Sequence, residues 1–136
     1  MKGWFQKEEE IYISLNKLVK AETAYLRSLG LREKILGPNN SLTVDTLQGL
    51  GNLYSEQGLY NKSEQILLRA LAIREKIQEP NHLDIGQLSN TIGVLYTRQG
   101  LYSEGNSFYL RAISIYENTG KLNQSKVNHE TFLYGK

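Results

Sequence analysis

The fold of this chain is decided by the stretch LGNLYSEQGLY, residues 50–60, which returns as IGVLYTRQGLY at residues 92–102. The second copy begins 42 residues after the first. A segment that recurs at one fixed spacing is the signature of a repeat protein. Each copy reads as the end of one helix, a turn at a glycine and the start of a second helix. The sequence therefore predicts stacked helix pairs.

Single residues extend this period over most of the chain. The spacing of 42 recurs for arginine at Arg27, Arg69 and Arg111, for glutamate at Glu33, Glu75 and Glu117, and for tyrosine at Tyr12, Tyr54 and Tyr96. We predict one array over residues 1–136, with units at about 1–42, 43–84 and 85–124, and with residues 125–136 as a capping or truncated helix.

Within the second unit, Ser41 is expected to cap a first helix that Gly58 ends, because glycine adopts a left-handed conformation without a steric penalty. The second helix is expected to begin at Tyr60 and to stop at Pro80. Apolar residues at helical spacing predict the core of this unit and the next: Leu47, Leu50, Leu53, Tyr54, Leu67, Ala70, Leu71 and Ile77, then Leu88, Ile92, Leu95, Tyr96, Tyr109, Ala112 and Ile113. We expect Gly51 and Gly93 where two helix axes come close.

The first unit and the end of the chain follow the pattern less closely. We expect a first helix from Trp4 to about Leu15 and a turn at residues 16–18. After Gly120, Ser125 is expected to cap a short helix with Phe132, Leu133 and Tyr134, or to start a fourth unit.

Tyrosines at packing positions are predicted to be core residues, namely Tyr12, Tyr54, Tyr60, Tyr96 and Tyr102.

Composition excludes several functions. The formal net charge is only +2, which gives no electrostatic reason to expect nucleic acid or a membrane surface as partner. There is no cysteine, and the two histidines are isolated, so we expect no metal and no cofactor. No secretory signal and no run of about 18 apolar residues is present, which predicts a cytoplasmic protein. No phosphate loop or nucleophile motif occurs, and we expect no enzyme activity and no catalytic residue.

The repeated residues resemble the tetratricopeptide repeat. Its signature positions are filled by Leu50, Gly51, Tyr54, Ser63, Leu67 and Ala70, by Ile92, Gly93, Tyr96, Gly105, Tyr109 and Ala112, and in part by Phe5, Tyr12, Ala21, Tyr25 and Ser28. The usual period is about 34 residues. The longer unit, with its Ile-Arg-Glu-Lys and Gly-Pro-Asn segments, resembles the kinesin light chain type, which is common in cyanobacterial proteins.

This resemblance implies an all-α, right-handed superhelical solenoid of antiparallel helix pairs. It also implies a scaffold that binds a peptide or partner protein on the concave face formed by the first helices. The expected binding residues, whose amides can pair with a peptide backbone, are Gln48, Asn52, Ser55, Gln87, Asn90, Thr97 and Arg98. Asp45, Glu56, Thr91 and Val94 are expected on the same face. Lysine and asparagine are absent where some families clamp a terminal carboxylate, so no such clamp is expected.

Two alternatives stay open. The chain is either a fragment or sensor segment of a larger repeat-containing signalling protein, or a structural module that self-associates through its end repeats. The apolar tail residues Phe132, Leu133 and Tyr134 favour self-association, because an uncapped apolar face attracts a partner.

Overall fold

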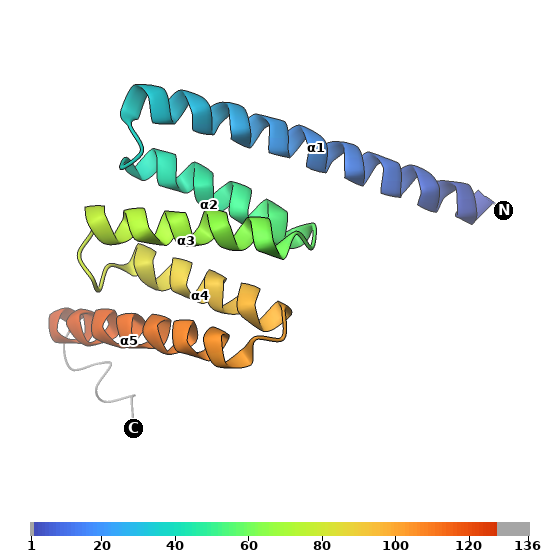
Figure 1. Ribbon diagram of the computed structural model, residues 1–136. Helices are drawn as coiled ribbons and strands as arrows, with labels where there is room; N and C mark the ends of the chain where they lie inside the picture. The colour runs from blue at the N-terminus through green and yellow to red at the C-terminus, as the bar shows by residue number, and fades with distance from the viewer. Residues whose placement is uncertain (1, 128–136) are drawn as a thin grey trace.

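The protein folds as a row of helices. Our computed structural model describes the backbone of residues 2–127 and the side chains of residues 7–120. Over that range it consists of α1 (Lys2–Leu36), α2 (Ser41–Glu56), α3 (Tyr60–Ile77), α4 (Leu83–Arg98) and α5 (Tyr102–Val127), with no strand. The helices lie side by side in chain order, and each runs opposite to the one before it (Figure 1). The closest pairs are α2 with α3 and α4 with α5, as the period predicts.

Glycine turns join the two helices of each pair. Gly58 has a φ of +78° and Gly100 a φ of +81°, in the left-handed region. At both turns the next residue donates its backbone N–H to a tyrosine carbonyl, from Leu59 to Tyr54 and from Leu101 to Tyr96, each at 2.9 Å. This bond satisfies a carbonyl that the end of the helix would leave without a partner. The predicted turns are therefore confirmed.

The helix starts differ slightly from prediction. The cap of α2 is Asn40 rather than Ser41, since the Asn40 side chain accepts a hydrogen bond of 2.9 Å from the Leu42 N–H. His82 does the same for α4, accepting from the Asp84 N–H at 3.0 Å. Both caps lie in the loop that joins one unit to the next.

The core runs between the helices of the second and third units. Its fully buried side chains include Leu47, Leu50, Leu67, Leu88, Ile92 and Leu95. Gly51 and Gly93 lie where helices touch: a Cβ atom built on Gly51 would fall 2.5 Å from Leu67, and one on Gly93 would fall 2.8 Å from the Tyr109 ring. Ser63 donates a hydrogen bond of 2.7 Å to the Gly51 carbonyl across the same contact. The predicted close approach is confirmed.

Three apolar predictions at the ends of the row are wrong. Tyr12 is 75% exposed and Tyr102 is 69% exposed, whereas Tyr54 and Tyr96 are buried and Tyr60 is half-buried. Ile113 is 49% exposed, and Ile115 takes its place in the core. The equivalents of these residues in the second unit, Tyr54, Tyr60 and Leu71, belong to the core or pack against it. At either end of the row no described helix covers the corresponding position.

The first unit contains no turn. The predicted break at residues 16–18 is wrong, because α1 is one continuous helix of 35 residues. Asn16 stands where the second unit has Gly58, and asparagine adopts the left-handed turn conformation less readily than glycine. The N-terminal half of α1 consequently projects beyond the other helices (Figure 1).

The last helix also continues further than predicted. It runs through Gly120 and Ser125 to Val127, so Ser125 does not cap a separate helix. Leu122 replaces the proline found at Pro38 and Pro80 in the earlier units, and nothing at that position stops the helix. The predicted segment with Phe132, Leu133 and Tyr134 lies outside the described residues.

Two contacts repeat with the period and join neighbouring units. The Tyr54 hydroxyl donates to Glu22 and the Tyr96 hydroxyl donates to Glu64, both at 2.8 Å. Burial, followed by the bond to Glu64, raises the pKa of Tyr96 to about 12. Ion pairs join Arg69 to Glu33 at 2.7 Å and Arg111 to Glu75 at 2.8 Å. The recurrence of Glu33 and Glu75 in the sequence thus reflects the stacking of neighbouring units.

Candidate peptide-binding face

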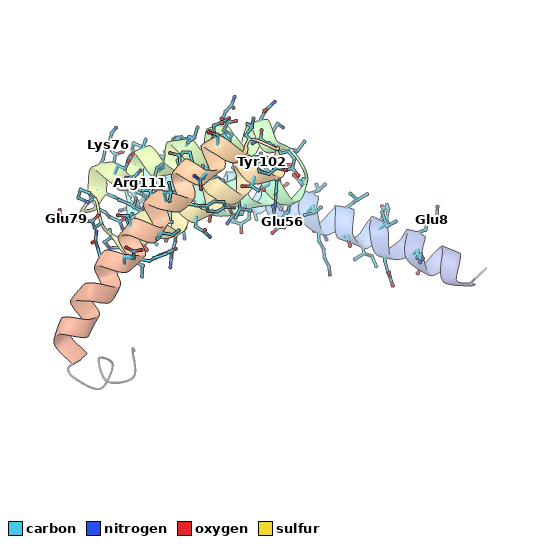
Figure 2. The ribbon with its side chains drawn as sticks, turned by 90° about the horizontal axis from the view of Figure 1, so that it is seen from below. Glu8, Glu56, Lys76, Glu79, Tyr102 and Arg111 are labelled. Atoms are coloured by element: carbon cyan, nitrogen blue, oxygen red, sulfur yellow. The ribbon has the colours of Figure 1, made fainter. Side chains whose placement is uncertain are left out.

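A shallow hollow lies between α2 and α4, the first helices of the second and third units. Its volume is about 220 Å³, and its lining residues are Asn52, Ser55, Glu56, Asn90, Thr91, Val94 and Arg98. All seven belong to the face that the sequence predicts to be concave. The hollow lies toward the end of the stack from which α1 projects, where Figure 2 shows Glu56, away from Lys76 and Glu79.

Two units contribute to this hollow because their first helices present equivalent positions. On α4 the residues Thr91, Val94 and Arg98 recur at three- and four-residue intervals and share one face. Arg98 donates a hydrogen bond of 2.9 Å to Ser55 and so spans from α4 to α2. The guanidinium forms no ion pair with any carboxylate that the structure describes, so its positive charge is available to a ligand.

The hollow offers mixed hydrogen-bonding chemistry. Asn52 and Asn90 are exposed, and each amide carries both a donor and an acceptor. Thr91 uses its hydroxyl proton on the Gln87 carbonyl at 3.1 Å, which leaves its oxygen as an acceptor. An extended peptide backbone needs donors and acceptors of this kind along its length.

Gln48 lies outside the hollow and is already engaged. Its side-chain oxygen accepts two hydrogen bonds from the Arg74 guanidinium, at 3.1 and 2.8 Å. Arg74 also donates to Asp45 at 2.5 Å and to Ser41 at 3.3 Å. The Arg74 side chain is only 4% exposed, so its charge depends on these partners. Gln48 and Asp45 therefore hold α3 against α2.

Arg74 is the residue that sequence reasoning missed. A second carboxylate, Asp84 of α4, lies 3.7 Å from the Arg74 guanidinium and receives a hydrogen bond of 2.8 Å from Gln78. Arg74 thus connects the start of α2 to the start of α4. The sequence holds one signal of this role, since another arginine, Arg32, stands one period before Arg74. In the structure Arg32 likewise contacts α2, because it donates a hydrogen bond of 2.7 Å to Thr46.

The two remaining predicted residues differ in position. Gln87 is exposed on the stripe of α4 that carries Thr91 and Arg98, one turn before the hollow. Thr97 faces α5 instead: its hydroxyl donates to the Gly93 carbonyl at 2.9 Å and lies 3.4 Å from the Tyr109 hydroxyl. Thr97 shares the face of Gly93, where α4 and α5 come closest.

Within the described range, no group of three histidine or acidic side chains is arranged to hold a metal ion. No described helix is long and apolar enough to cross a membrane.

Stacked antiparallel helix pairs with a hollow on their first helices define an all-α repeat solenoid. The tetratricopeptide repeat model matches residues 10–76 and again residues 54–118. The chain belongs to the tetratricopeptide repeat family, as its motifs predict. Membership supports a general role as a protein-interaction scaffold.

The fold has a solved counterpart. The crystal structure of BtubC (BKLC) from P. vanneervenii superimposes with a TM-score of 0.73 at 24% sequence identity. The match covers 82% of this chain and 44% of the BtubC chain, so the matched region spans less than half of that protein. No match was found among curated proteins. The likeness to BtubC establishes the fold alone.

Proposed function

We propose that the hollow between α2 and α4 binds an extended segment of a partner protein and that the protein acts as a non-catalytic adaptor. The observation that carries the proposal is the composition of the hollow. Seven residues from two units line it, and only Asn52 and Asn90 bear side-chain amides. Their equivalents one period away differ: Asn52 corresponds to Val94, Ser55 to Thr97 and Glu56 to Arg98. Residues that build the fold repeat, whereas these do not.

The chemistry of the hollow favours a segment with an acidic side chain. Arg98 has a neutral partner, Ser55, and a carboxylate of the ligand would add a charge-assisted hydrogen bond. Glu56 lines the same hollow and disfavours a run of acidic residues. We therefore propose a single Asp or Glu, flanked by neutral residues whose backbone pairs with the two asparagine amides.

Little reorganisation is needed for such binding. The hollow lies on two helices fixed by a common core, so the ordering of the binding surface costs little at the moment of association. With only two units contributing, the binding surface is small, and we expect a weak interaction of the micromolar class rather than a tight one.

A peptide-display selection tests this proposal with a defined probe. The immobilised protein is offered a library of random peptides, and enriched peptides are synthesised and titrated by calorimetry. We expect the triple variant Asn52→Ala/Asn90→Ala/Arg98→Ala to bind at least about tenfold more weakly, because three polar contacts are lost. The matched control is Asn61→Ala/Gln65→Ala/Lys76→Ala, which removes the same types of side chain from exposed positions on α3. Equal binding by both triple variants would refute the proposed site.

A further inference from the structure

The periodic ion pairs leave one unused charge at each end of the row. Internally, Arg69 pairs with Glu33 and Arg111 pairs with Glu75. Each pair joins an arginine to the glutamate that stands 36 residues earlier. By the same rule Arg27 would need a glutamate before it, and Glu117 would need an arginine after it. Neither residue forms an ion pair with any other described residue.

No element that the structure describes covers the outward side of α5, although this side matches a surface that is covered inside the array. Leu110, Ile113 and Glu117 recur at helical spacing and form one stripe. One period earlier, Leu71 lies buried in the core beneath α4, whereas its equivalent Ile113 is 49% exposed and Leu110 is 58% exposed. The stripe thus joins two large apolar side chains to the unused carboxylate.

The outward side of α1 has the opposite charge. Arg27 and Leu31 each lie two residues from the buried Leu29, which places them on the far side of the helix from α2. With Val19, Lys20 and Ala24 they line an open groove along the surface of this one helix. Leu31 is 53% exposed, whereas its equivalent one period later, Ile73, is buried. This side of α1 also matches a surface that is covered inside the array.

We propose that a second copy of this chain stacks end to end on the first, with the α5 stripe of one copy against the α1 groove of the next and with Glu117 beside Arg27. The two surfaces lie on the outermost helices at opposite edges of the row (Figure 1). Apolar side chains meet apolar side chains, and one cation (Arg27) meets one anion (Glu117). Because the two surfaces differ, each added copy presents a fresh end, and the assembly is an open chain rather than a closed dimer.

The association is weak and sensitive to salt. Exposed ion pairs contribute little individually and are screened by salt, so most of the attraction comes from the apolar side chains. Reversal of one charge replaces attraction with repulsion at every junction. We expect Arg27→Glu or Glu117→Arg to weaken association roughly tenfold in low salt.

A charge-swap experiment with sedimentation velocity tests the proposal. The wild type, measured over a concentration series, is expected to form growing oligomers. Arg27→Glu and Glu117→Arg are each expected to remain largely monomeric at the concentrations where the wild type begins to associate, and to need roughly tenfold more protein to do so. An equimolar mixture of the two variants is expected to associate again, because each junction then joins opposite charges. The controls are Lys76→Glu and Glu79→Arg, which reverse exposed charges that belong to neither surface (labelled in Figure 2).

Three results would overturn the proposal. The first is a wild type that remains monomeric at millimolar concentration, and the second is a mixture of the two variants that does not associate. The third is association that Arg27→Glu abolishes and Glu117→Arg leaves unchanged, since that pattern indicates a symmetric pairing of two α1 helices. Circular dichroism of each variant checks that the helices are intact.

Discussion

The Tyr96 hydroxyl donates a hydrogen bond of 2.8 Å to Glu64, and it thereby joins α4 of the third unit to α3 of the second. The bond from Tyr54 to Glu22 is its copy one unit earlier. The tyrosine of the repeat signature therefore has two roles, since its ring fills the core and its hydroxyl joins neighbouring units. Phe108 stacks on the Tyr96 ring, with the ring centres 5.5 Å apart, and so fixes the direction of the hydroxyl.

Tyr96→Phe is expected to lower the free energy of unfolding by about 1 to 2 kcal/mol, because it removes a hydrogen bond to a charged acceptor and keeps the ring. Urea denaturation followed by circular dichroism measures the change. Tyr102→Phe is the control, since Tyr102 is exposed and its hydroxyl forms no hydrogen bond with any residue that the structure describes. Its effect should stay within about 0.5 kcal/mol. Equal losses in the two variants would contradict the assigned role of the Glu64 bond.

The same bond predicts a dependence on alkaline pH. The pKa of Tyr96 is raised from 10.0 to about 12 in the folded state, so the folded protein retains a proton that the unfolded chain releases. The stabilisation is complete below pH 10 and is lost as the pH rises toward 12. The difference in unfolding free energy between wild type and Tyr96→Phe should therefore shrink over this range. A difference that stays constant from pH 9 to about 12 would show that the hydroxyl does not titrate as assigned.

Two helical glycines are expected to respond to alanine with opposite signs. Gly51→Ala places a Cβ atom 2.5 Å from Leu67, and the resulting overpacking should cost about 1 to 3 kcal/mol. Gly30→Ala meets nothing within 4 Å and should gain up to about 1 kcal/mol from helix propensity. Thermal unfolding of the two variants side by side provides the comparison. Stabilisation by both would mean that α2 and α3 are not in close contact.

Arg74→Ala is expected to cost about 3 kcal/mol or more, because it removes a buried side chain and leaves Gln48 and Asp45 without their donor. Arg74→Lys should recover only part of the loss, since an ammonium cannot reproduce the planar fork that reaches both partners. Equilibrium unfolding in urea measures both variants. Full stability of the lysine variant would indicate that charge alone, and not the hydrogen-bond geometry, fixes α3 against α2.

The sequence predicts well what depends on the interior of a unit. Gly58 and Gly100 specify their turns locally, and Leu50, Ile92 and their neighbours specify a buried stripe by spacing alone. Both features hold in the structure because residues within one unit determine them, whatever unit follows.

The errors arise where a neighbour decides the outcome. Tyr12 and Tyr102 match the repeat yet are exposed, since a period does not reveal whether a further helix covers an end. Asn16 stands at the glycine position of the other units, and α1 continues through it without a turn. The position of Gln48 predicts a place on the ligand face, but the sequence does not reveal that Arg74 donates two hydrogen bonds to its side-chain oxygen.

Chemical-shift mapping on the isotope-labelled protein tests the proposed binding face most directly. A peptide from the display selection is titrated into the protein, and the amide signals of every helix are followed. We expect the largest shifts at Asn52, Ser55, Asn90 and Arg98, with little change along the outward sides of α3 and α5. Shifts concentrated on α3 or α5, with the signals of the hollow unmoved, would contradict peptide binding between α2 and α4.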